Sequence, residues 1–444
     1  MFRSALLILS GNMVSSALLF ARNLALAALI PVGDYGIAAT FALVMTGVEM
    51  ASALGLQQQI VQARDGDDPH LQNALAGFQL FRGLLSAVAL FFLAGPIADF
   101  LNVPQVAWAY QVLAVVPLLR ALQHFDIHRL NRTHRFWPLV LTNTVPPLLS
   151  LIALWPLAVW LGDWRVMLIA LVFNDALTTA MSHLVAERRF GVAVDRALWG
   201  RSLRFGWPIL VNALILFLVF QGDKLVVGRL LGMEALGVFA LAVTLTLTPA
   251  LVLTKSLQTI FLPRLSAKGE TGHVARRLVA LALAAGLAVT CLGVLGGVLL
   301  APLLMGTGYA ALAAFVGPLA LVQGFRIAKS AGTIVALSRG RTGNAAWSNV
   351  PRIASLAVGI ALVAGGGSIP ALIWTAVLGE AAGMVLSLIL VVRDGGLVLP
   401  KRRLAIWGVG MAAAAVALFA LPALIPAAVI AGWLSRAALT GAQR

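Results

Sequence analysis

Eleven ionisable side chains lie within apolar stretches of this sequence, where a membrane or a protein interior would surround them. Seven are cations, namely Arg22, Arg82, Lys224, Arg229, Lys255, Arg326 and Lys329. Four are acids, namely Glu49, Asp175, Asp223 and Glu380. A charge at the centre of a membrane helix costs roughly 2.5–3.5 kcal/mol on insertion scales, so these residues are expected to face protein or a water-filled cavity. Such a placement is typical of transporters.

The cations outnumber the acids, so pairing among these residues leaves part of the positive charge uncompensated. Arg326 and Lys329 are three residues apart and are predicted to share one face of a helix. Arginine presents a planar fork that fits phosphate oxygens, and lysine adds a point charge. The pattern predicts a site for a phosphate or diphosphate group. Its expected substrate contacts are Arg22, Arg82, Lys224, Lys255, Arg326 and Lys329, with Glu49, Asp175, Asp223 and Glu380 as structural charge partners or coupling groups.

Other polar residues have simpler interpretations. Arg229 stands near the end of its apolar stretch, where a long side chain reaches the membrane interface. His124 and His128 have the spacing of a helical metal pair but lack a third ligand beside them, so no metal site is expected. No cofactor is expected either.

Composition indicates a polytopic membrane protein. The chain is 61% hydrophobic and 11% charged, with a mean hydropathy of +0.96, which lies outside globular usage. A net charge of +16 in a soluble protein would suggest nucleic acid, but here the charges gather in short loops, so no nucleic-acid partner is expected. The single cysteine, Cys291, excludes a disulfide within the chain.

Apolar runs predict an all-α protein with two six-helix lobes. The expected spans are 5–30, 35–62, 72–95, 105–124, 137–161, 165–186, 206–231, 236–262, 277–304, 310–337, 350–365 and 370–392. The predicted parts are a first lobe (1–186), a basic cytoplasmic linker (187–204), a second lobe (205–395) and additional C-terminal segments (396–444). The run 404–434 is either one long helix or a short hairpin, so the expected total is thirteen or fourteen spans.

Lysine and arginine placement predicts the orientation. With a cytoplasmic N-terminus, the cytoplasmic segments, to which Arg120 and Arg352 are assigned, hold 22 of these residues, and the outer loops hold Arg165 alone. By the positive-inside rule, we expect a multi-pass protein of the inner (plasma) membrane with its N-terminus in the cytoplasm. The loops are too short for a soluble domain and carry no Walker A or HExxH sequence, so no enzyme is expected.

A weak internal repeat supports the two lobes. Under a shift of 201 residues, Gly36-Ile37 falls on Gly237-Val238, Arg22-Asn23 on Asp223-Lys224, and Pro117-Leu118 on Pro318-Leu319. Two internal halves are the usual construction of secondary transporters.

Several stretches resemble polysaccharide-unit (O-antigen-type) flippases of the multidrug/oligosaccharidyl-lipid/polysaccharide (MOP) exporter superfamily. The resemblance rests on GDKLVVGRLLGMEALGVFALA (222–242), LILSGNMVSSALLFARNLALAALIPVGDYGIAA (7–39), MGTGYAA (305–311) and ALSRGRTGNAAW (336–347). It extends from residue 1 to about residue 395.

The resemblance implies a bundle of two six-helix lobes with a cation-lined cavity that alternates between the two membrane faces. The implied substrate is a polyprenyl diphosphate carrying a short oligosaccharide, whose headgroup crosses while its tail stays in the bilayer. The cationic cavity positions of the family would fall on Arg22, Lys255 and Arg326, with Asp223 and Lys224 nearby. A glycan polymerase and glycosyltransferases are the expected protein partners.

Three alternatives stay open at this point. A drug or organic-cation exporter of the same superfamily would need an acidic cavity, whereas this chain has Arg22 on its first helix. A peptidoglycan-precursor flippase is the second alternative. A non-transporting scaffold of a glycan-synthesis complex is the third, although a scaffold has no need of buried charges.

Overall fold

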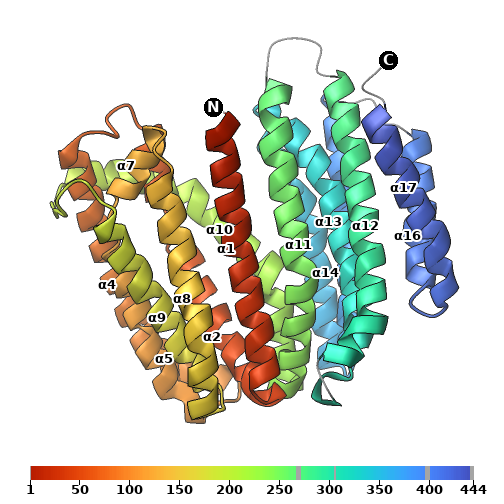
Figure 1. Ribbon diagram of the computed structural model, residues 1–444, viewed down its shortest axis with the longest axis horizontal. Helices are drawn as coiled ribbons and strands as arrows, with labels where there is room; N and C mark the ends of the chain where they lie inside the picture. The colour runs from red at the N-terminus through yellow and green to blue at the C-terminus, as the bar shows by residue number, and fades with distance from the viewer. Residues whose placement is uncertain (1, 267–271, 305–306, 396–400, 441–444) are drawn as a thin grey trace. The chain divides into compact units, whose positions relative to one another are not determined.

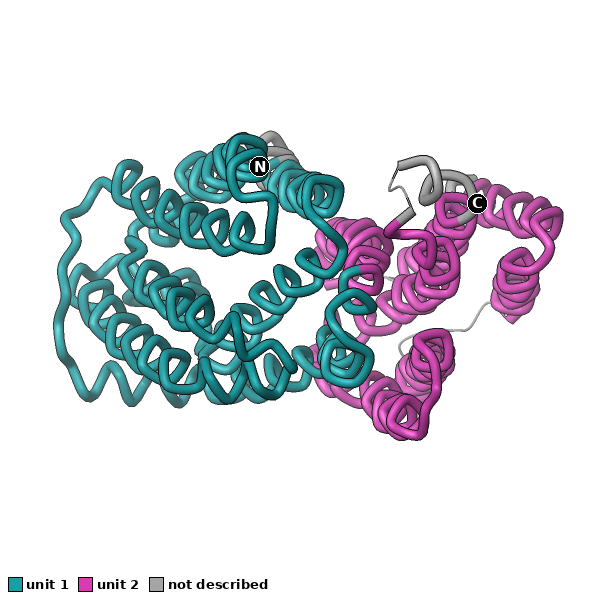
Figure 2. The backbone as a smooth tube through the Cα atoms, turned by 90° about the horizontal axis from the view of Figure 1, so that it is seen from below, with its two compact units in different colours: residues 1–237 teal, residues 238–444 magenta. Residues whose placement is uncertain are grey.

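The elements of the computed structural model are α-helices and short 3-10 turns throughout the described residues, which are 2–266, 272–304, 307–395 and 401–440. Met305 and Gly306, at the start of the MGTGYAA stretch, lie outside them. So do parts of the predicted second lobe and of the C-terminal segment. By their internal contacts, residues 1–237 and 238–444 form two compact units, unit 1 and unit 2 (Figure 2).

Unit 1 contains ten helices in the described residues (Figure 1). They are α1 (Phe2–Leu29), α2 (Val32–Ala51), α3 (Leu56–Gln62), α4 (Pro69–Phe100), α5 (Ala107–Leu113), α6 (Val115–Ala121), α7 (Asp126–Arg132), α8 (Trp137–Leu161), α9 (Arg165–Leu184) and α10 (Arg196–Leu231). Helix α1 packs against α8, α8 against α9, α4 against α5 and α6, and α10 against α2.

Local sequence signals set several helix ends in this unit. The Asp68 side chain accepts a hydrogen bond from the His70 N–H (2.9 Å) at the start of α4, and the Asp195 side chain caps α10 in the same way. Such caps satisfy N–H groups that have no partner within the helix. At the C-terminal end of α8, Gly162 adopts a left-handed φ of 66°, which glycine accepts without steric cost.

Helix α10 places the boundary between the units later than the sequence predicts. The predicted linker is 187–204, but α10 already begins at Arg196 and packs against α2 and α4 of unit 1. Small residues of α10 such as Gly206, Ala213 and Gly222 are buried, whereas larger apolar side chains such as Leu203 and Trp207 are exposed. The division between the two compact units falls after residue 237.

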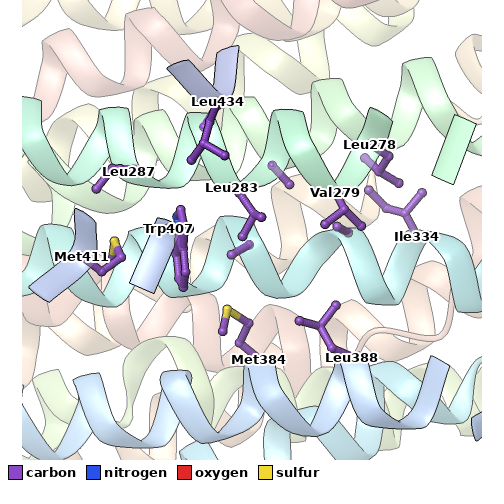
Figure 3. Close-up of a cluster of buried hydrophobic side chains, with 14 of the residues drawn as sticks. Leu278, Val279, Leu283, Leu287, Ile334, Met384, Leu388, Trp407, Met411 and Leu434 are labelled. Atoms are coloured by element: carbon purple, nitrogen blue, oxygen red, sulfur yellow. The ribbon is translucent and has the colours of Figure 1, made fainter. Parts of the chain in front are cut away.

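Unit 2 contains the remaining helices of the described residues. They are α11 (Met233–Ser266), which starts within unit 1, α12 (Gly272–Leu304), α13 (Leu312–Ser338), α14 (Gly343–Ala364), α15 (Ile369–Arg393), α16 (Lys401–Val416) and α17 (Leu424–Thr440). The run 404–434 thus forms two helices. Both pack against α12. In the core of this unit, Leu283 of α12 lies near Met384 of α15 and Trp407 of α16 (Figure 3).

The expected membrane spans coincide with helices. By length and composition, nine helices in the described residues can cross a membrane, and up to eleven if two bent pairs are each one span. The bent pairs are α2 with α3, at 48°, and the segment of α5 and α6 with α7, at 47°. Within α1, the described part supplies a shorter apolar helix, Met13–Leu29.

The helix bounds follow the 201-residue shift. Helix α2 begins at Val32 and α11 at Met233, while α1 ends at Leu29 and α10 at Leu231. At these starts, a Cβ on Gly36 would lie 1.8 Å from the Met233 carbonyl oxygen, and one on Gly237 would lie 2.3 Å from that of Val32. Gly36 of α2 therefore approaches Met233, the first residue of α11. Gly237 of α11 likewise approaches Val32, the first residue of α2. This reciprocal contact is what two related halves would make.

Candidate functional site

A polar cavity of about 540 Å³ lies within unit 1. Four charged side chains line it: Glu49 of α2, Arg82 of α4, Arg120 of α6 and Asp175 of α9. Amide side chains line it as well, namely Gln57, Gln58, Gln79, Gln123, Asn143 and Asn174. The volume falls within the range of about 300–1,000 Å³ that is usual for small-molecule sites. Three predicted site residues, Glu49, Arg82 and Asp175, are thus brought together.

Arg120 connects the two acids of this cavity. Its Nη1 lies 2.6 Å from Glu49 Oε2, and its Nε lies 2.7 Å from Asp175 Oδ1. A second hydrogen bond, from Nη2 to Asp175 Oδ2 at 3.3 Å, makes the contact with Asp175 bidentate. Bidentate arginine–carboxylate pairs fix direction as well as charge. The side chain of Asp175 is 5% exposed and that of Glu49 is 64% exposed, so the Asp175 pair is the buried one.

Backbone contacts hold Arg120 in place. Gln79 of α4 donates from Nε2 to the Arg120 carbonyl oxygen at 2.9 Å. Thr179 of α9 donates from Oγ1 to the Leu119 carbonyl oxygen at 2.7 Å. Helix α6 is therefore fixed to the helices on both sides of the cavity. Arg120 was assigned to a cytoplasmic segment and was not among the predicted site residues, but it stands in the last turn of α6 and lines the cavity.

Arg82 and Arg22 carry no ion pair with a carboxylate in the part of the chain that the structure describes. Arg82 is half-buried, and its Nη1 donates to the Ser52 carbonyl oxygen. Arg22 of α1 is buried, with 7% exposed, and Asp175 exerts an electrostatic attraction on it. The Nε atoms of both arginines are buried without a hydrogen-bond partner. An anion that bound these two Nε atoms would replace the hydrogen bonds to water that burial removes.

A second charge cluster lies within unit 2, around the fully buried Glu380 of α15. Arg326 of α13 donates to Glu380 Oε1 from Nη2 at 2.7 Å and from Nε at 3.0 Å. Lys329, one turn later, donates from Nζ to Glu380 Oε2 at 2.7 Å and to Asn349 Oδ1 at 2.9 Å. The predicted common face of Arg326 and Lys329 is confirmed, because both reach one carboxylate. Three further predicted residues, Arg326, Lys329 and Glu380, are thus brought together.

Arg352 was also assigned to a cytoplasmic segment, and the structure places it within helix α14. It is 2% exposed and among the largest fully buried side chains. Its Nη1 donates to Ser355 Oγ at 3.3 Å. The apolar run expected at 350–365 lies in a helix that begins seven residues earlier, at Gly343, so about two helical turns precede residue 350.

The remaining predicted residues are not among those that line the polar cavity. Asp223 and Lys224 are adjacent, half-buried residues of α10. Lys255 of α11 is exposed and makes no ion pair within the described ranges. Arg229, at the end of α10, donates to Asn102 Oδ1 at 2.5 Å, as its interpretation as a helix-end residue suggests.

The ion pairs in the two units occupy corresponding helices. Under the internal repeat, α6 corresponds to α13 and α9 to α15. Arg120 of α6 pairs with Asp175 of α9, and Arg326 of α13 pairs with Glu380 of α15. The two cations are separated by 206 positions and the two acids by 205, which is about one helical turn more than the shift of 201. In each half, an ion pair thus joins a cation of the fourth predicted span to an acid of the sixth predicted span.

Comparison with known proteins agrees with this architecture. The sequence profile of a family described as "Polysaccharide biosynthesis protein" matches residues 25–313. The succinoglycan biosynthesis transport protein ExoT of Rhizobium meliloti (strain 1021) is 22% identical over 231 residues, which are 50% of this chain and 44% of ExoT. The chain therefore aligns with less than half the length of that relative.

Solved structures share the fold at low sequence identity. The lipid II flippase MurJ, in an inward closed conformation, has a TM-score of 0.77 at 11% identity, over 96% of this chain and 98% of MurJ. An inward-facing multidrug resistance MATE transporter of the MOP superfamily has a TM-score of 0.68 at 15% identity, over 87% of this chain and 96% of that one. The expected all-helical MOP fold is confirmed.

Proposed function

The chain belongs to the polysaccharide biosynthesis protein family, and we propose that it is a flippase for a polyprenyl-diphosphate-linked oligosaccharide. It moves this lipid from the cytoplasmic to the outer leaflet of the inner membrane, for surface polysaccharide synthesis, by alternating access. The observation that carries the proposal is the pair of arginines, Arg22 and Arg82, that lie in apolar helices without an ion pair to a described carboxylate.

The pattern of ion pairing supports an anionic substrate. Asp175 and Glu49 pair with Arg120, and Glu380 pairs with Arg326 and Lys329. With Arg22 and Arg82 included, these groups comprise five cations and three acids. A diphosphate would supply negative charge to Arg22 and Arg82, and it offers several oxygens to each arginine.

Within the predicted set of substrate contacts, the proposal distinguishes two roles. Arg22 and Arg82 of unit 1 attract the diphosphate, and Lys224 of α10 and Lys255 of α11 remain proposed substrate contacts. Arg326 and Lys329 chiefly hold α13 to α15 through Glu380, because a buried cation that is already paired gains little from a further anion. Sugar hydroxyls would bind the amide side chains of the polar cavity in unit 1. A glycan polymerase and glycosyltransferases are the proposed neighbours in the membrane.

Complementation of a flippase-deficient strain, scored by surface glycan, tests this proposal. Arg22→Gln, Arg82→Gln and Lys255→Gln are expected to lower export strongly, while each protein stays in the membrane. Arg82→Lys keeps the charge but loses the bidentate geometry, so partial export is expected. The control Arg64→Gln changes an exposed loop arginine and should export normally. Full export by the triple Gln variant would refute an anion-binding role.

The exposed Glu49 carboxylate favours one second candidate, an organic-cation exporter. It opens to the cavity with 64% of its side chain exposed, and carboxylates attract cationic drugs. Cells that overproduce the protein separate the two candidates. A cation exporter would extrude a cationic dye and lose this activity in Glu49→Gln, whereas the flippase leaves dye accumulation unchanged in both cases.

A further inference from the structure

A second space in unit 1 differs in character from the polar cavity. It is a groove of about 710 Å³ between α2, α4 and α10. Its lining is almost entirely apolar and includes Leu85 and Leu93 of α4 and Leu203, Trp207 and Phe217 of α10. Leu85, Leu93, Leu203 and Trp207 are all exposed. The groove therefore opens to the surface of unit 1.

The groove and the polar cavity meet at Arg82. Both spaces are lined by Val48, Ser52, Leu54, Arg82 and Ser86. Arg82 is the charged residue among these five. Its Nε is buried without a hydrogen-bond partner, and no described carboxylate pairs with it. An apolar space and a polar space thus share a boundary at a cation, which is the pattern of a site for a lipid with a phosphate headgroup.

The groove is long enough for an extended chain. Along α4 its lining runs from Arg82 to Phe100, and 18 residues of helix at about 1.5 Å each span about 27 Å. This length approaches the hydrocarbon thickness of a bilayer, which is about 30 Å. A lipid chain in the groove would remain at membrane depth along its whole course.

The polar cavity indicates a sugar-bearing lipid rather than an ordinary phospholipid. Its amides and carboxylates provide the donors and acceptors that sugar hydroxyls need. Asn174 Oδ1 is buried in the described structure without a hydrogen-bond partner, and such an atom gains from a hydroxyl donor. A phospholipid phosphate would use Arg82 and leave the rest of the cavity unfilled.

We propose that this groove binds the polyprenyl chain of a polyprenyl-diphosphate-linked saccharide, with the diphosphate at Arg82 and the first sugars in the polar cavity. The inference rests on the proposed function and adds a binding site for the lipid within unit 1 alone. It also assigns Arg82, rather than the paired Arg120, as the diphosphate contact. Arg120 is paired with both acids of the cavity.

Photo-crosslinking of the purified full-length protein tests the site directly. The protein is placed in phosphatidylcholine nanodiscs with a polyprenyl diphosphate that carries a benzophenone on its chain. Crosslinks are expected in peptides of α4 and α10. Unlabelled polyprenyl diphosphate should compete, whereas phosphatidylglycerol and inorganic diphosphate should not at the same concentration. Equal competition by phosphatidylglycerol would show a general phospholipid site and overturn the inference.

Two neighbouring leucines provide a matched pair of variants. Leu85 lines the groove and is 59% exposed, while Leu84 is 55% exposed and does not line it. Leu85→Trp fills the groove beside Arg82 and should weaken binding of the probe at least tenfold. Leu84→Trp should bind as the wild type does. Arg82→Gln should also weaken binding at least tenfold, with partial recovery in Arg82→Lys.

The outcomes separate this inference from the proposed function. If the wild type restores surface glycan and Leu85→Trp both exports and binds normally, the groove is not the lipid site, although the flippase function stands. Equal losses of probe binding in Leu84→Trp and Leu85→Trp would likewise overturn the assignment of the groove as the lipid site. If the wild type neither restores glycan nor crosslinks to the probe, the function itself is refuted, and the inference with it.

Discussion

Glu380 and Glu49 offer a test of how much burial adds to an ion pair in this protein. Both are glutamates, and each contacts a cation at 2.6–2.7 Å. The Glu380 side chain is 0% exposed and that of Glu49 is 64% exposed. The same substitution, Glu→Gln, therefore removes one charge from each environment with almost no change in side-chain volume.

The expected magnitudes differ severalfold. Glu380→Gln leaves Arg326 and Lys329 buried without their carboxylate, and breaking a buried pair costs about 3–5 kcal/mol. Glu49→Gln removes an exposed pair, which contributes about 0–1 kcal/mol, and Arg120 keeps Asp175. For a cooperative unit of 150–250 residues, each kcal/mol lowers Tm by about 2–4 °C. Glu380→Gln is thus expected to lower Tm by about 6–20 °C and Glu49→Gln by about 4 °C at most.

Thermal unfolding of the detergent-purified protein, followed by size-exclusion chromatography after heating, measures this difference. Because Glu380→Gln leaves two cations uncompensated, adding Lys329→Gln should recover part of the loss. Recovery in the double variant distinguishes charge imbalance from simple loss of packing. Equal Tm values for Glu380→Gln and Glu49→Gln would refute the reasoning that burial decides the magnitude.

Further predictions concern orientation and packing. In a Cys291→Ala background, Ser368→Cys should react with an impermeant thiol reagent added to intact cells, and Asp67→Cys should be protected; the reverse pattern would invert the proposed topology. Gly36→Ala should reduce protein abundance, because its Cβ would overlap a backbone carbonyl, whereas Gly33→Ala has open space around it and serves as the control. Deleting α16 and α17 should expose the apolar face of α12 and lower Tm; an unchanged Tm would show that these helices are dispensable for stability.

Hydropathy predicted most of the fold, because membrane spans are specified by local composition. Each expected span from 5–30 to 370–392 falls on a helix or on a bent pair of helices. The hairpin at 404–434 was left undecided, since length and apolarity allow both one long helix and two short ones. Packing against α12 resolves it into α16 and α17.

The candidate site was predicted in part. Glu49, Arg82 and Asp175 line one cavity, and Arg326 meets Glu380. Arg120 and Arg352 were missed for one reason: a basic residue near the end of a span has the same sequence pattern whether it faces the cytoplasm or the protein interior. For Arg120, the internal repeat was a signal in the sequence, because α6 corresponds to α13, which carries Arg326.

The sequence by itself determined what depends on near neighbours along the chain. Helical periodicity placed Arg326 and Lys329 on one face, and the 201-residue repeat indicated two related halves, because both are properties of sequence spacing. Only the tertiary structure decided which acid belongs to which cation. Glu49 and Asp175 are 126 positions apart, yet they meet on Arg120, and this pairing leaves Arg82 at the boundary of the cavity and the groove. Such contacts follow from the packing of distant helices, since a side chain's partner is set by the three-dimensional path of the backbone rather than by its neighbours in sequence.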